Sequence, residues 1–228
     1  MIGSHLHERA YAGPFFAFLG LLFFGQAVAG LGDGYAHWAL AEPRYWVYPL
    51  QLAVCAALLW RWRGCIVFGP LRGAGTAAVA GLIALLLWVF PQQFLGFPAR
   101  TDGFRPDFFG SEGLPYWLNV AGRFARLVVI VPLVEEIFWR GFLLRYLVRE
   151  DFRAVPFGTF TWQSFAITSG AFCLEHQPAD WPAALLTGAL YNVVAYRTRS
   201  LAACVITHAV TNLGLGIWVM RTGQWGFW

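Results

Sequence analysis

Seven apolar stretches follow one another along the chain, most of them close to the length that a helix needs to cross a bilayer. Crossing the hydrocarbon core takes about 20 mostly apolar residues. Of the 228 residues, 58% are hydrophobic and only 12% are charged, and a soluble domain carries about twice that charged share. A water-soluble core of this size cannot bury so much apolar surface. The sequence therefore predicts an all-α, polytopic transmembrane helix bundle with about seven spans, at 14–30, 45–60, 76–90, 117–147, 160–175, 181–196 and 201–220.

The segment 94–114 is the place where an eighth span could be hidden. It carries Asp102, Asp107 and Glu112 among aromatic residues, and carboxylates are costly at bilayer depth. We therefore expect an interfacial loop there, with an eighth or re-entrant span as the alternative. Since there is no internal repeat or low-complexity tract, we expect one membrane domain, 1–228.

Two local features qualify the helix predictions. Arg9, an apolar run and the small residues at 27–29 resemble a signal peptide with its cleavage site, although an ordinary uncleaved first span is the favoured interpretation. Pro49 and Pro132 fall inside predicted spans and should kink the helices or open them locally.

The distribution of arginine predicts the orientation in the membrane. All 16 basic residues are arginines, and they cluster between the apolar runs. With the N-terminus in the cytoplasm, nine arginines lie inside, four lie outside and three lie in the fourth span. The positive-inside rule thus favours a multi-pass cell-membrane protein with a cytoplasmic N-terminus and an external C-terminus. Because these clusters are explained by topology, no nucleic-acid partner is expected.

The fourth span contains the most unusual residues, two carboxylates and a guanidinium in an otherwise apolar helix. Glu136 and Arg140 are four residues apart, so they share a helix face and can form an ion pair. Glu135 points about 100° away from Glu136. Glu136 is therefore the predicted structural partner of Arg140, and Glu135 is free for chemistry. An ion pair that merely locks helices together is the simpler alternative.

Two further spans carry histidines at depth. The fifth places Phe172 and His176 on one face, and the seventh does the same with His208 and Asn212. A single buried histidine is usually a hydrogen-bonded core residue. Two of them, following a Glu-Glu helix, favour proton transfer with a nearby carboxylate.

These three motifs, taken together and in this order, resemble those of the CAAX prenyl protease 2 and bacteriocin-processing (CPBP, or Abi) family. The motifs are Glu135-Glu136-x-x-x-Arg140, Phe172-x-x-x-His176 and His208-x-x-x-Asn212, and the stretch 188–201 is also similar to the family. The resemblance covers 131–212 and implies a catalytic core at about 117–220. No N-terminal span carries a matching motif.

The resemblance also implies roles for these residues. Glu135 would be the general base that activates a water, with His176 holding that water. His208 and Asn212 would stabilise the oxyanion, while Glu136, Arg140 and Phe172 would support the site. No cofactor is favoured, because Asn212 suits an oxyanion donor. Zinc is the alternative, with Glu135, His176 and His208 as its ligands.

The expected function is thus an intramembrane endopeptidase that acts on a peptide or lipidated protein within the lipid bilayer. The family resemblance also suggests a bacterial member associated with an exosortase system. A non-catalytic immunity or scaffold protein and a proton-coupled transporter are the alternatives. One difficulty stands against the protease: the predicted ends place Glu135 and His176 about 10 Å apart in depth, unless the segment after His176 dips into the bundle.

Overall fold

The fold was analysed in a computed structural model that describes residues 2–32, 37–71, 73–98 and 103–228. Within these ranges the chain is helical and contains no strand. All seven predicted spans are helical, which confirms the all-α class. Residues Arg72, Arg100 and Asp102, which entered the topology and loop predictions, lie outside the described ranges.

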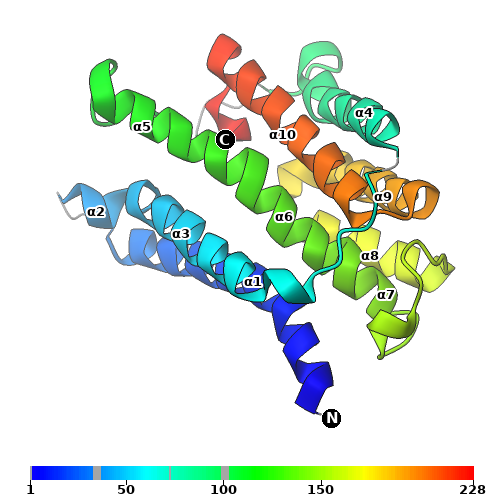
Figure 1. The fold of residues 1–228 in the computed structure, drawn as a ribbon. Coiled ribbons are helices and arrows are strands. Elements are labelled where there is room, and N and C mark those ends of the chain that lie inside the picture. The colour runs from blue at the N-terminus through cyan, green and yellow to red at the C-terminus, as the bar shows by residue number, and fades with distance from the viewer. Residues whose placement is uncertain (1, 33–36, 72, 99–102) are drawn as a thin grey trace.

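The N-terminal half contributes three long helices and one short one, α1 (Ile2–Leu31), α2 (Trp38–Ala41), α3 (Arg44–Trp62) and α4 (Ala74–Phe94). The first helix begins well before the predicted start at residue 14, because polar residues beyond the apolar run continue the helix. Pro14 lies inside α1, and Figure 1 shows a bend between the N-terminal part of this helix and the rest. Tyr11, Phe15 and Phe18 of α1 are buried in the core.

A single long helix follows and occupies the centre of the bundle. It comprises α5 (Gly113–Phe124), a π-helical segment η2 (Ala125–Ile130), α6 (Val131–Glu136), a second π-helical segment η3 (Ile137–Leu143) and α7 (Leu144–Tyr146). In Figure 1 it runs diagonally between the α1/α3 pair and the α4/α10 pair. At about 50 Å by helical rise it is longer than the hydrocarbon core is thick.

Three helices complete the bundle, namely α8 (Trp162–Glu175), α9 (Trp181–Thr198) and α10 (Leu201–Thr222). Small residues let these helices pack closely. A Cβ added at Gly81 of α4 would lie 2.6 Å from the carbonyl oxygen of Thr207 in α10, and the Thr211 hydroxyl donates to the Gly81 carbonyl at 3.0 Å. Such close helix contacts are typical of membrane bundles.

Three of the long helical stretches, His5–Leu31, Ala74–Phe94 and Leu201–Thr222, are long and apolar enough to cross a membrane by themselves. The other predicted spans are helices that are shorter, less apolar or divided by π-helical turns. The predicted loop at 94–114 is confirmed for its described part, since the chain between Phe94 and Gly113 forms turns, with Arg105 paired to Asp107 at 2.8 Å.

Candidate active site

The Glu136–Arg140 pair forms as its spacing predicted. Nη1 of Arg140 lies 3.0 and 3.2 Å from the two carboxylate oxygens of Glu136, and both side chains are fully buried. Arg140 also donates from Nε to the Asn192 amide oxygen at 3.0 Å and from Nη2 to the Gly188 carbonyl at 2.9 Å. The guanidinium therefore ties the central helix to α9, and its charge is compensated inside the protein.

Glu136 has a second partner that the sequence did not reveal. Its Oε1 lies 2.9 Å from Nδ1 of His208 on α10. A carboxylate oxygen accepts, so Nδ1 of His208 is the donor in this hydrogen bond. The other ring nitrogen, Nε2, is then available to the cavity that His208 lines. Glu136 thus positions His208 as well as Arg140.

Pro132 and the π-helical segment before it create the anchor for Asn212. In η2 the Val131 N–H reaches back five residues to the Arg126 carbonyl. The next bond in that register would run from residue 132 to Leu127, but proline has no N–H. The freed Leu127 carbonyl accepts instead from Nδ2 of Asn212, at 2.9 Å. The predicted local opening at Pro132 is therefore what orients Asn212.

Glu135 lies on a different face of the helix and has a different environment. It is only 6% exposed, and its Oε2 is buried without a hydrogen-bond partner. The side chain lines a cavity of about 360 Å³. Because a buried carboxylate normally finds partners, an unpaired one beside a cavity marks a group that is suited to bind or activate a molecule entering there.

His176 lines the same cavity from the end of α8. Its Nδ1 lies 2.8 Å from the carbonyl oxygen of Phe172, which can only accept, so Nδ1 carries the proton and Nε2 offers a lone pair. The ring packs against Phe172 and Trp88, with centroids 4.9 and 5.4 Å away. Phe172 therefore fixes the orientation of His176, and it also contacts Arg140, whose guanidinium carbon lies 5.0 Å from the ring centroid.

The cavity brings together all four of the predicted catalytic residues, Glu135, His176, His208 and Asn212. Glu135 and His176 line one cavity despite the difference in depth that the predicted helix ends implied. The helix α8 is short and ends at Glu175, and the 3-10 turn Pro178–Asp180 leads directly into α9. His176 is thereby held within the bundle, at the wall that Glu135 also lines.

Four charged residues of the cavity, Arg123, Arg126, Glu175 and Asp180, were not among the site residues predicted from the sequence. Glu175 is half-buried and accepts a hydrogen bond from the Trp139 indole at 3.1 Å. Arg123 and Arg126 are buried and line the same cavity. Their spacing of three residues places them on one helix face, and the structure turns that face to the cavity.

The described residues do not fit a metal site. No three His, Cys, Asp or Glu side chains in the described ranges are grouped so that they could hold a metal ion, and this includes Glu135, His176 and His208. We therefore assign no step to zinc.

Residues 117–214 match the family model described as Rce1-like, type II CAAX prenyl endopeptidase. This range contains all three motifs. No curated protein and no solved structure matches the chain.

Proposed function

We propose that the protein is an intramembrane endopeptidase in which Glu135 activates the hydrolytic water, because residues 117–214 match the model of the Rce1-like family of type II CAAX prenyl endopeptidases. One observation carries this proposal. Two adjacent carboxylates differ completely in their environment, since Glu136 is saturated by Arg140 and His208 whereas Glu135 has an unpaired oxygen at the cavity.

The proposed reaction begins with a water held between Glu135 and Nε2 of His176. Glu135 accepts a proton from the water, whose oxygen attacks the carbonyl carbon of the scissile peptide bond. The negative charge that develops on the carbonyl oxygen is stabilised by Nε2–H of a protonated His208 and by the second N–H of the Asn212 amide. Glu135 then returns its proton to the departing amine as the C–N bond breaks.

Glu136 makes this role of His208 possible. For Nε2 to donate, the imidazole must carry both protons, and Oε1 of Glu136 lies 2.9 Å from Nδ1 as the acceptor of the other one. Asn212 can serve the same oxyanion because only one of its two amide hydrogens is used by Leu127. The assignment requires no metal.

A second cavity supports a lipid-bearing substrate. It measures about 390 Å³, is lined mainly by apolar side chains of α4 and α9, and shares Trp88 with the catalytic cavity. An apolar chain attached near the scissile bond could lie there while the peptide enters the polar cavity. We accordingly propose a lipidated peptide or protein as the substrate. For the orientation, we propose a cytoplasmic N-terminus and an external C-terminus, from the arginine distribution.

The test uses the purified protein in lipid nanodiscs and a farnesylated peptide that ends in Cys, two aliphatic residues and one variable residue. The wild-type protein should release a C-terminal fragment that mass spectrometry identifies, and Glu135→Gln should slow release by at least about 100-fold. The matched control is Glu112→Gln, an exposed carboxylate at the start of the same long helix, which should leave the rate unchanged. Equal rates for Glu135→Gln and wild type would refute the proposed base.

The alternative functions make different predictions in this assay. A scaffold or immunity protein, or a proton-coupled transporter, would release no fragment with any variant. The family match does not favour these alternatives.

A further inference from the structure

Arg123 and Arg126 are two buried cations that the proposed hydrolysis does not use. They are 6% and 5% exposed and line the same cavity as Glu135. Both guanidinium groups pack on the ring of Tyr48, 4.8 and 4.1 Å from its centroid. They therefore form one basic wall of the catalytic cavity.

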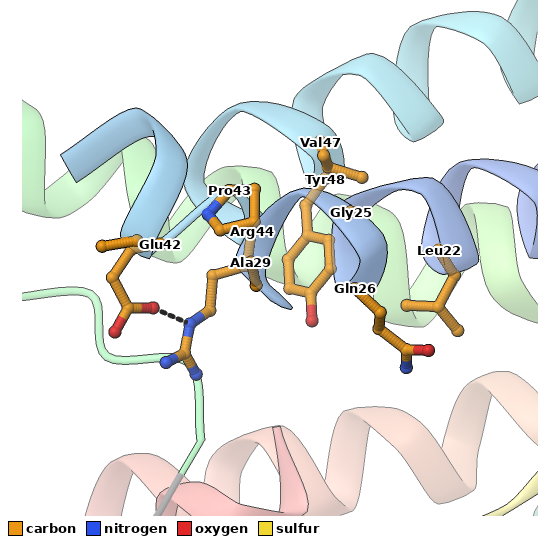
Figure 2. Close-up of a pocket in the computed structure, with 10 residues that line it drawn as sticks. Leu22, Gly25, Gln26, Ala29, Glu42, Pro43, Arg44, Val47 and Tyr48 are labelled. Atoms are coloured by element: carbon orange, nitrogen blue, oxygen red, sulfur yellow. Dashed lines mark hydrogen bonds and ion pairs between the residues drawn. The ribbon is translucent and has the colours of Figure 1, made fainter. Parts of the chain in front are cut away.

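These two buried arginines differ from Arg140, which is also buried, because they have no carboxylate partner. Nε and Nη1 of Arg123 are buried without a hydrogen-bond partner, and Nε of Arg126 donates to the neutral amide of Gln51 at 2.9 Å. Within the described ranges, neither forms an ion pair with a carboxylate. Arg140 is paired with Glu136, by contrast, and Arg44 is paired with Glu42 at 2.6 Å, as Figure 2 shows.

A buried charge without a counter-charge costs several kcal/mol and leaves donors that need acceptors. An arginine pair presents several N–H groups in the planar geometry that suits a carboxylate or a phosphate. The unmet donors of Arg123 point to an anionic ligand within the cavity rather than to a purely structural pair.

We propose that Arg123 and Arg126 form a subsite that binds the free carboxylate at the C-terminus of the peptide substrate. This inference rests on the proposed function and adds to it the group by which the substrate is recognised, its C-terminal carboxylate. Arg126 and Arg123 precede Glu135 by nine and twelve residues, or about 13 and 18 Å of helical rise. An extended peptide covers about 3.4 Å per residue, so, with the length of the arginine side chain included, bond cleavage at Glu135 falls roughly three to five residues from the bound carboxylate.

The path to this subsite is polar. Gln26 and Tyr48 line both the catalytic cavity and a pocket of about 250 Å³ between α1 and α3. In Figure 2 the polar ends of Gln26, Tyr48 and Arg44 point to the same side. A further cavity of about 500 Å³ adjoins Tyr48 and is lined by Arg44 and Arg105. A charged peptide terminus can therefore approach Arg123 along basic and hydrogen-bonding side chains rather than across lipid.

The same arginine pair could bind the phosphate of an anionic lipid. The experiment therefore distinguishes a peptide carboxylate from a lipid phosphate. The probe is an equimolar mixture of aliphatic tripeptides, supplied either as free acids or as C-terminal amides. Binding is measured as the rise in melting temperature of the protein in nanodiscs of neutral phosphatidylcholine. Because binding needs no turnover, the result does not depend on whether the protein cleaves peptides.

The wild-type protein should bind the acids at least about 10-fold more tightly than the amides. Arg123→Gln should abolish this preference, and Arg123→Lys should retain part of it, because it keeps the charge but not the planar fork. Arg221→Gln, an exposed arginine at the end of α10, is the matched control and should keep the full preference. Since Arg123 has unmet donors, its substitution by glutamine should not impair folding.

Two results would overturn the subsite. One is equal binding of acids and amides by the wild-type protein, or an unchanged preference in Arg123→Gln. The other is a protein that shows no preference for acids but is stabilised by added phosphatidylglycerol in the absence of peptide, with Arg123→Gln removing this stabilisation. That result would assign the arginine pair to a lipid. Loss of the proposed function would appear differently, as acid-selective binding without cleavage of any peptide.

Discussion

The adjacent residues Glu135 and Glu136 provide a paired test, because the same isosteric substitution should have opposite effects at the two positions. Glu136 accepts two hydrogen bonds from Arg140, at 3.0 and 3.2 Å, and one from His208 at 2.9 Å. Glu136→Gln removes the charge that compensates Arg140 and turns one acceptor oxygen into a donor that faces other donors.

The magnitude follows from the burial of this pair. Both side chains of the ion pair are 0% exposed, and removing one partner of a buried pair costs about 3–5 kcal/mol. For a chain of this size, this corresponds to a fall in melting temperature on the order of 10 °C, by the scale known for soluble domains. Glu135→Gln removes no hydrogen bond at the unpaired Oε2, so its melting temperature should stay the same or rise.

The assay is thermal unfolding of both variants in the same nanodiscs, followed by tryptophan fluorescence, with cleavage of the farnesylated peptide measured in parallel. We expect Glu135→Gln to be stable and inactive and Glu136→Gln to be destabilised. An equal loss of stability in the two variants, or a neutral Glu136→Gln, would refute the division of roles between the two carboxylates.

Three further predictions concern the surroundings of Glu135. Asn212→Leu should lower the rate of cleavage by about 100- to 1,000-fold, measured as kcat on the farnesylated peptide, because it removes an oxyanion donor; a change below threefold would exclude that role. Glu175→Gln should lower the same rate by less than 10-fold, since its carboxylate is bound to Trp139, and a loss larger than that of Glu135→Gln would move the base to Glu175. Leu186→Trp, which narrows the apolar cavity between α4 and α9, should raise KM for the farnesylated peptide severalfold and leave the unlipidated peptide unaffected, whereas an equal effect on both peptides would argue against a lipid-binding role.

The sequence predicted side-chain positions correctly where the spacing of residues within one helix determines them. Helical spacing alone placed Glu136 beside Arg140 and turned Glu135 to another face, and the structure has both arrangements. The positions of the helices followed from the apolar runs, although α1 begins at Ile2 rather than at residue 14. Apolar patterning finds the part of a helix that lies in lipid, but a helix that continues into water leaves no such signal.

Contacts between distant segments could not be derived in this way. His208 reaches Glu136 across 72 residues, and Arg126 reaches Gln51 across 75. Both contacts depend on how the helices rotate and pack, which no spacing within a single helix determines. The partial burial of Glu175 could not be derived either, because the exposure of this side chain depends on where α8 ends relative to the rest of the bundle.

For Pro132 the sequence predicts the local effect on the helix but not the long-range contact that results from it. Its effect on the helix was predictable, because proline lacks the N–H that a helix interior needs. The identity of the group that uses the freed Leu127 carbonyl was not predictable, since Asn212 lies on a different helix, 85 residues away along the chain.

Glu135 has the central role in the proposed mechanism, as the base of a peptide hydrolysis that takes place in native membranes. The most direct measurement is mass spectrometry of membrane peptides from native cells carrying either the parent protein or Glu135→Gln. We predict at least one unprocessed peptide that accumulates only in the variant, together with loss of its short C-terminal fragment. Identical peptide profiles in the two, with the variant protein present at normal abundance, would contradict the central claim.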